Sequence, residues 1–158
     1  MPNAVPRASR CLRLAAADFT LLSAGVCAAQ SPPPVINGPP ISPGQARVWL
    51  YRVFFPEDSG EMPAVAVNGQ TIGYARAGWS FYRDMPAGTY HVSVASYLPS
   101  GSKDIVLHPG TQAALSIQSS PYETGDLSSF RRGVYDVTAE PGGTAYQHIT
   151  QTQFGTGY

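Results

Sequence analysis

Three histidines are the imidazoles with which this chain could perform acid–base or metal chemistry: His91, His108 and His148. A metal site needs several such ligands to converge, often together with a carboxylate. The separations of 17 and 40 residues match no local ligand motif, so we predict no metal and no cofactor. His91 deserves the closest inspection, because a cleft that joined it to Asp104 or Asp136 would indicate a hydrolase.

Serine and acidic side chains also occur in small groups. Ser102 and Lys103 are adjacent, but Ser–Lys enzymes use a different spacing and a buried lysine, and no Gly-x-Ser-x-Gly elbow is present. Glu57, Asp58 and Glu61 could offer oxygen ligands to calcium, but they lack the spacing of a calcium-binding loop. Both groups are more typical of solvated turns than of an active site or a calcium site, and we predict no catalytic residues.

Aromatic and arginine side chains give the strongest indication of a binding surface. Most of the aromatics must be core, because a domain without disulfides depends on large buried side chains. Two strands carry adjacent pairs that could expose a patch: Tyr51 with Arg52, and Tyr82 with Arg83. Aromatic platforms suit sugar faces, and arginine with tyrosine suits protein interfaces. These four residues are the predicted site for a glycan or protein partner.

The elements that must position these residues are short strands. Apolar and polar residues alternate through most of the chain after Ala46, and no convincing helix is visible. Seven or eight strands separated by turn signals predict an all-β, antiparallel two-sheet sandwich of immunoglobulin- or transthyretin-like type. The expected strands fall in segments 46–55, 63–75, 78–85, 89–97, 103–108, 111–120 and 130–140.

Two turns are predicted in detail. Asn68-Gly69 is a strong hairpin signal, because a type I′ turn needs positive φ at both positions. The hairpin should therefore span residues 63–75. Pro86-Ala87-Gly88 predicts a tight corner, with Gly88 in a conformation closed to other residues. We expect that corner to return the chain beside the strand that precedes it.

The first 29 residues have the features of a secretory signal peptide. Three arginines precede a short apolar run that ends in small residues, with a cut expected after Ala29. A mitochondrial transit peptide or a simple disordered leader are the alternatives. Cys27 is disfavoured as a lipid anchor, because Ala24 and Val26 stand where a lipoprotein signal has Leu and a small residue.

The leader sets the expected domain boundaries and compartment. Residues 30–45 are proline-rich and predict an extended linker, with a groove-binding ligand as the alternative. The sandwich should span 46–140, and 141–158 should form a polar, glycine-rich tail that is irregular or carries a short helix. We expect a periplasmic or extracellular protein; an outer-membrane lipoprotein is the weaker alternative.

The ordered set of strands and turns resembles a known family. Tyr51-Arg52, the Asn68-Gly69 turn, Gly78 followed by aromatics, and the Pro-Ala-Gly corner before Tyr90 are similar to a family of exported bacterial proteins known only as a domain of unknown function. The corner also resembles turns of PEGA-type and transthyretin-like sandwich modules. The resemblance covers residues 46 to 137. It implies a small exported β-domain and transfers no catalytic residue.

Composition narrows the function further. The formal net charge is zero and only 13% of residues are charged, which does not favour nucleic-acid or anionic-membrane binding. The apolar run of the leader is too short for a transmembrane span. We therefore predict a non-catalytic protein-binding or structural module of the bacterial envelope. A glycan-binding module and a hydrolase with a cryptic site are the alternatives.

Overall fold

The computed structural model describes residues 36–56, 60–95, 100–119 and 134–158. These residues belong to one compact unit, which extends over Pro32–Tyr158. The predicted leader, the Cys27 motif and the first part of the proline-rich linker lie outside the described residues. So do Glu57 and Asp58 of the acidic turn.

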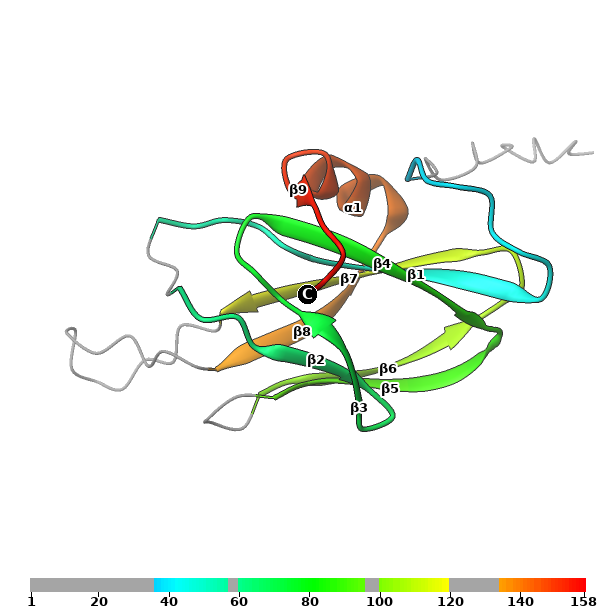
Figure 1. Ribbon diagram of the computed structural model, residues 1–158, viewed down its shortest axis with the longest axis horizontal. Helices are drawn as coiled ribbons and strands as arrows, with labels where there is room; N and C mark the ends of the chain where they lie inside the picture. The colour runs from blue at the N-terminus through cyan, green and yellow to red at the C-terminus, as the bar shows by residue number, and fades with distance from the viewer. Residues whose placement is uncertain (1–35, 57–59, 96–99, 120–133) are drawn as a thin grey trace, which may run out of the picture. The chain divides into compact units, whose positions relative to one another are not determined.

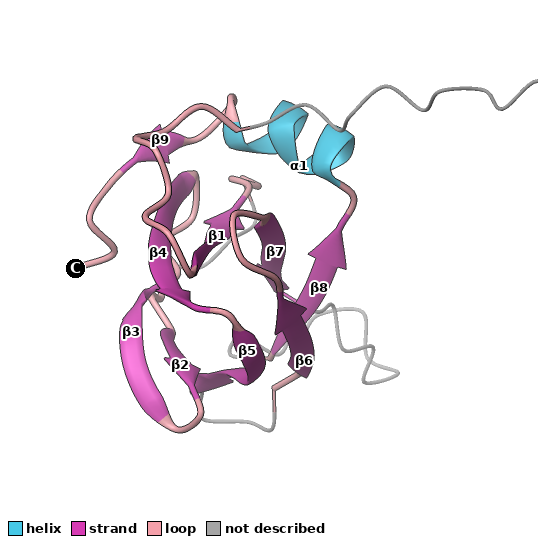
Figure 2. Ribbon diagram, turned by 90° about the vertical axis from the view of Figure 1, so that its right-hand side faces the viewer, coloured by secondary structure: helices cyan, strands magenta, loops and turns pink. Residues whose placement is uncertain are grey.

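The two-sheet sandwich predicted from sequence is confirmed, and Figures 1 and 2 show its two layers. The five-stranded sheet has the order β8 (Tyr135–Glu140), β7 (Gln112–Ser119), β1 (Gln45–Arg52), β4 (Trp79–Pro86) and β9 (Gln153–Phe154). The four-stranded sheet has the order β3 (Gln70–Tyr74), β2 (Ala64–Val67), β5 (Gly88–Ala95) and β6 (Ser102–Leu107). The first sheet is mixed, because β1 pairs with β7 and β4 with β9 in parallel.

Strand β1 is the centre of the five-stranded sheet. It pairs along its whole length with β4, and on its other side residues 47–51 pair with β7. Val48 and Leu50 point into the core between the sheets, and Trp49 and Tyr51 point to the opposite face. All four are buried, as expected for a strand that is apolar on both faces.

The predicted hairpin of segment 63–75 is confirmed as β2 and β3. Asn68 and Gly69 connect the strands with φ of 49° and 81°, the two positive values that the predicted turn requires. On the neighbouring strand of the same sheet, Val94 of β5 lies opposite Val65 of β2 and Val92 lies opposite Val67, and all four are core residues.

The prediction for the Pro86-Ala87-Gly88 corner is wrong in two respects. Strand β4 lies in the five-stranded sheet and β5 in the four-stranded sheet, so the corner carries the chain between layers and does not make a hairpin. Gly88 also does not have a positive φ, so it does not adopt the expected conformation. The physical reason is that β5 has both of its partners, β2 and β6, in the four-stranded sheet, where Val92 and Val94 join the core.

The segment expected to be a polar tail is part of the domain. Residues 142–149 form helix α1 (Gly142–Ile149), and residues 153–154 form β9. Ala145 and Ile149 lie one helical turn apart and pack with Trp49 and Tyr51 on the outer face of the five-stranded sheet. Figure 2 shows α1 on the side of this sheet that faces away from the other layer. The expected domain end at residue 140 is therefore corrected.

Part of the expected linker also packs. Ile36 is buried in the same outer cluster as Trp49, and the carbonyl of Pro39 accepts a hydrogen bond from the side chain of Arg47. The described end of the proline-rich segment is therefore attached to the sheet. Within the part of the chain that the structure describes, no helix has the length and apolar character needed to cross a membrane.

Candidate binding pocket

The structure does not bring the four predicted site residues to one exposed face. Tyr51 and Arg52 are both buried and, as neighbours on β1, they point to opposite sides of the sheet. Arg52 donates to the carbonyls of Glu61 and Ala75 and lies over the Tyr135 ring. The prediction of a common exposed patch is therefore wrong, because alternation along a strand separates adjacent side chains.

Tyr82 lies in an aromatic cluster on the outer face of the five-stranded sheet. Its ring is 5.0 Å from that of Trp49 and stacks on Phe154 of β9 at 5.5 Å between centroids. The guanidinium carbon of Arg47 lies 4.0 Å from the Tyr82 centroid. Tyr82 is thus half-buried between an arginine and two aromatic rings, and it contributes mainly to packing.

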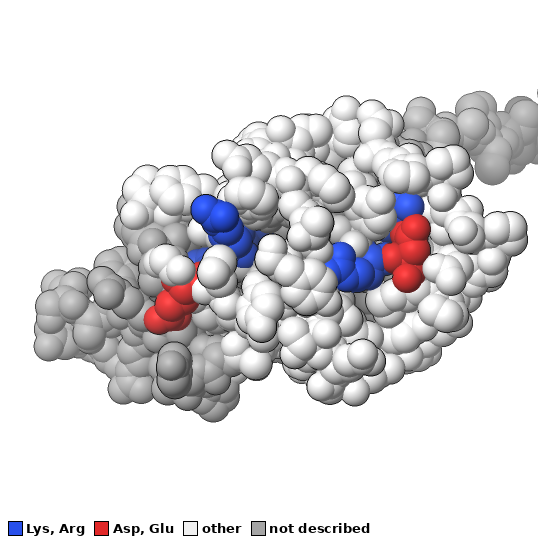
Figure 3. All heavy atoms as spheres, viewed as in Figure 1, with Lys and Arg blue, Asp and Glu red and all other residues white. Residues whose placement is uncertain are grey.

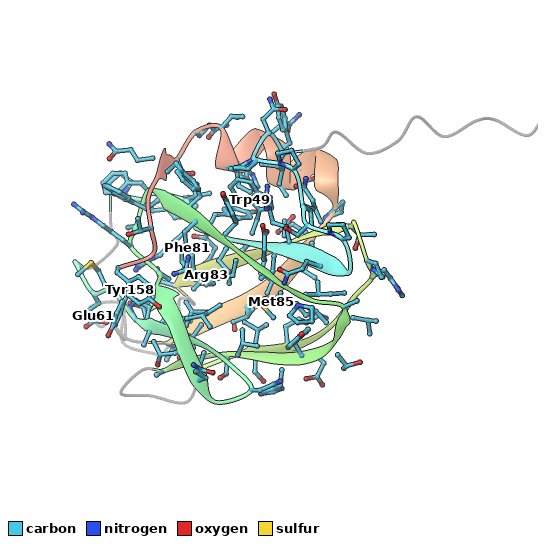
Figure 4. All side chains as sticks on the ribbon, turned by 45° about the vertical axis from the view of Figure 1, so that its right-hand side comes forward. Trp49, Glu61, Phe81, Arg83, Met85 and Tyr158 are labelled. Carbon is cyan, nitrogen blue, oxygen red and sulfur yellow. The ribbon has the colours of Figure 1, made fainter. Side chains whose placement is uncertain are left out.

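Arg83 connects the two sheets to the C-terminal segment. Its guanidinium donates to the carbonyls of Ile72 on β3, Thr156 and Tyr82. The same group lies 5.1 Å from the centroids of both Phe81 and Tyr158, and Figure 4 shows Phe81, Arg83 and Tyr158 close together. Arg83 therefore has a structural role, because its contacts with Thr156 and Tyr158 hold residues 155–158 in place. We name residues 155–158 the strap.

The strap closes the side of the sandwich between β4 and β3. The amide of Gly155 donates to the Ser80 carbonyl on β4, and the amide of Tyr74 on β3 donates to the Gly157 carbonyl. The strap can lie this close only because glycines face the aromatic rings. A Cβ on Gly155 would stand 2.7 Å from the Trp79 ring, and one on Gly157 would stand 2.8 Å from the Phe81 ring.

Replacing Gly157 with alanine should displace the strap. The new methyl group would clash with the buried Phe81 ring, and φ of +84° at this position is strained for any residue with a side chain. We expect the free energy of unfolding to fall by about 1–3 kcal/mol in denaturant titrations. Gly110→Ala is the control, because φ there is also positive while the site is open. Equal losses in both variants would mean that the strap contact contributes nothing.

A pocket of about 230 Å³ lies beside the strap. Its lining comes from β3, β4, the turn between them, the strap, and Met62 in the segment before β2. The described residues that line it are Met62, Tyr74, Arg76, Trp79, Ser80, Phe81, Gly155, Thr156, Gly157 and Tyr158. Three of the large side chains are exposed despite being apolar or aromatic, namely Met62, Tyr74 and Tyr158. Exposed apolar groups gathered around a pocket are typical of an interaction site.

Arg76 supplies the charge of this pocket. Its guanidinium carbon lies 4.5 Å from the centroid of Trp79, which fixes the cation over the ring. No carboxylate or imidazole belongs to the described lining. Figure 3 shows that charged side chains on this face form two separate groups, with uncharged surface between them. The pocket therefore combines an apolar interior with a cation at its rim.

His91 does meet the carboxylate that the hydrolase alternative required. Its Nδ1 lies 2.7 Å from Asp104 Oδ1, across the β5–β6 pair. Both side chains are more than half exposed, and neither lines the pocket. The described residues contain no group of three histidine, cysteine or acidic side chains placed to hold a metal. The pair is thus a hydrogen-bonded contact on an open sheet surface.

Another histidine, His148 of helix α1, contacts the side chain of Tyr51. Its hydroxyl lies 3.1 Å from Nδ1 of His148, in the last turn of the helix. Burial, followed by the negative charge of Glu140, raises the pKa of Tyr51 to about 12. The phenol therefore stays protonated at neutral pH, and the contact helps to hold α1 on the sheet.

The pocket residues were not recognised in the sequence, because they come from three separated segments. Met62, Tyr74 and Arg76 precede the strand with the predicted aromatics, and the strap lies at the other end of the domain. One signal was available. The spacing Gly155-Thr156-Gly157-Tyr158 places two glycines before an aromatic, a pattern suited to close backbone approach.

Comparison with known proteins gives little similarity. No family model and no curated protein matches the sequence. A solved structure of the N-terminal domain of AlgF from P. aeruginosa is similar to it at 22% sequence identity and a TM-score of 0.37, over 63% of this chain and 98% of that one. A likeness at this level transfers neither fold nor function, and the expected family membership stays a prediction.

Proposed function

We propose that this chain is an exported, non-catalytic protein-binding module, whose pocket beside the strap receives an apolar side chain of a partner protein. The observation that supports the proposal most directly is the pocket itself. Aromatic side chains and Met62 surround a space beside an exposed edge of the sandwich, with one arginine at the rim. Buried aromatic anchors and arginine are the residues that most often dominate protein interfaces.

A protein partner fits this pocket better than a glycan does. Sugar rings stack on flat aromatic platforms, whereas the Tyr74 and Tyr158 rings meet edge to face at an angle of 73°. The volume of about 230 Å³ is also below the roughly 300–1,000 Å³ of small-ligand sites. It is suited to one side chain and not to an extended oligosaccharide.

The chemistry of the lining supports binding over hydrolysis. Ser80 and Thr156 are the aliphatic hydroxyls of the described lining, and neither has an imidazole or carboxylate beside it there to act as a base. The His91–Asp104 pair lies on open surface, where neither water exclusion nor a substrate cleft assists it. A reactive constellation is therefore not assembled around this pocket.

Export is proposed from the leader. The arginines, the short apolar run and the small residues before Gln30 favour cleavage near Ala29 and a periplasmic or extracellular location. Cleavage there would remove Cys11 and Cys27, the two cysteines of the chain. A periplasmic fraction that contains the chain with Gln30 as its first residue would support this part of the proposal, and cytoplasmic retention of the intact leader would contradict it.

The binding function can be tested with random peptides displayed on phage and, in parallel, with an array of polysaccharides. We expect peptides with an apolar residue to be selected by the purified chain. Met62→Asn should weaken their binding about fivefold, because it removes apolar contact area from the pocket. Val106→Asn is the matched control: Val106 is 61% exposed and Met62 55%, but Val106 is on β6 and does not line the pocket.

Three results would contradict the proposal. Equal binding of the selected peptides to the wild type and Met62→Asn would place their site elsewhere. Equal weakening by Met62→Asn and Val106→Asn would indicate a general effect on the fold. Binding to polysaccharides that is lost in Met62→Asn, without any selected peptide, would establish the glycan alternative.

A further inference from the structure

We infer that the partner presents an acidic side chain next to the apolar one, and that Arg76 at the pocket rim pairs with that carboxylate. This inference rests on the proposed function, because it names the chemistry of the segment that would occupy the same pocket. The partner in question is an extended segment of a protein that contains glutamate or aspartate beside an aromatic or aliphatic residue.

The first argument comes from comparing the arginines that the structure describes. Arg47 donates to Asp84 and Pro39, Arg52 donates to two carbonyls, and Arg83 donates to three. Arg76 is the exception among these four: its guanidinium lies over Trp79 but has no hydrogen-bond acceptor or salt-bridge partner in the described part of the chain. Its polar donors are thus available to a ligand.

The second argument is charge complementarity. Glu61 precedes Met62 in the chain, but its carboxylate accepts a hydrogen bond from Tyr135 and forms no ion pair with Arg76. The lining contributes no acidic side chain of its own. The stack on Trp79 holds the guanidinium beside the apolar space, so a carboxylate that paired with Arg76 would bring its neighbouring side chain to the pocket.

The third argument favours an acidic side chain over a chain terminus. Proteins that capture a terminal carboxylate usually do so with a group of backbone amides. Here four amides around the pocket already have acceptors: Tyr74 donates to Gly157, Arg76 to Tyr74, Trp79 to Arg76 and Gly155 to Ser80. The cation of the lining is the exposed Arg76 side chain at the rim, which suits a side chain from a segment that passes over the pocket.

The test uses the two tryptophans as reporters in ¹H–¹⁵N NMR titrations of the ¹⁵N-labelled chain. The indole of Trp79 lines the pocket, whereas the indole of Trp49 is buried and donates to Gln112, so it serves as the internal reference. The probes are Ac-Gly-Phe-Glu-Gly-NH₂, its Gln counterpart, and Ac-Gly-Phe with a free terminal carboxylate. We expect the Trp79 signal to shift and the Glu peptide to bind about fivefold more tightly than the Gln peptide at low salt.

Arg76→Gln supplies the matched variant. It should remove the difference between the Glu and Gln peptides while leaving the Gln peptide bound, and high salt should reduce the difference in the wild type. Equal binding of the two peptides to the wild type would overturn the inference and leave the pocket function standing. Tightest binding of the free-terminus peptide would also overturn it, in favour of a chain end. No shift of Trp79 with any peptide at about 10 mM would overturn the proposed function itself.

Discussion

Replacing Arg47 with alanine is expected to lower the free energy of unfolding by about 3 kcal/mol, measured by urea titration. Arg47 is 1% exposed, and its guanidinium makes two hydrogen bonds to Asp84, at 2.6 and 2.8 Å, and one to the Pro39 carbonyl. It also packs on Tyr82. The alanine variant loses all of these contacts and leaves the Asp84 carboxylate without its counter-charge.

Arg76→Ala is the control for this experiment. It also replaces an arginine with alanine, but at an exposed site where the guanidinium makes no hydrogen bond to the described residues. We therefore expect the free energy of unfolding to change by no more than about 0.5 kcal/mol. A loss of similar size in both variants would mean that the partly buried ion pair adds nothing beyond the bulk of the arginine side chain.

The Arg47–Asp84 pair also predicts how stability depends on pH. Hydrogen bonding to Arg47 lowers the pKa of Asp84 and raises that of Arg47 above its usual value. Because the folded pKa of Asp84 is depressed, its contribution is complete above the unfolded value of about 4 and is lost as the pH falls through the folded value. Asp84→Asn should therefore cost about 2 kcal/mol between pH 5 and 8, with the difference from wild type shrinking below about pH 4.

The second large effect is expected in the core between the sheets. Leu50→Ala should lower the free energy of unfolding by about 3 kcal/mol, because it removes a fully buried side chain from the central strand and leaves a cavity. The neighbours of Leu50 belong to two strands, Phe81 on β4 and Leu115 on β7, and these cannot both move inward to fill the space.

Val106→Ala is the control for the core substitution. Val106 is exposed on β6, so truncation there should change stability by less than about 0.5 kcal/mol. A cost for Leu50→Ala below about 1 kcal/mol would contradict the central position of β1, since only a site able to collapse would tolerate the loss.

Local sequence patterns predicted the strands well, because strand alternation and tight turns are determined by residues that are close together in the sequence. The alternation in β1 and the Asn68-Gly69 turn depend on neighbouring residues alone, and both were confirmed. The Pro-Ala-Gly corner was assigned to the wrong topology, because a turn does not specify whether the next strand joins the same sheet. That choice depends on which partner strands are available, and β5 pairs with β2 and β6 of the other sheet.

The candidate site was less accessible to sequence reasoning. Exposure of Tyr51 and Arg52 could not be judged without knowing that helix α1 covers one face of β1 and the second sheet the other. The pocket depends on residues 155–158 returning to β3 and β4, a contact between distant segments. Polar, glycine-rich composition obscured this return, since glycine here permits close packing instead of flexibility.

The position of residues 142–157 has a consequence for the order of folding. Strand β1 obtains its full cover only when residues 142–149 pack on it, and the edge beside β4 is completed only by residues 153–157. Until these residues have packed, the outer face of β1 and the edge of β4 lack their cover. Contacts between segments far apart in the sequence therefore complete this domain, and such contacts form later than a local hairpin does.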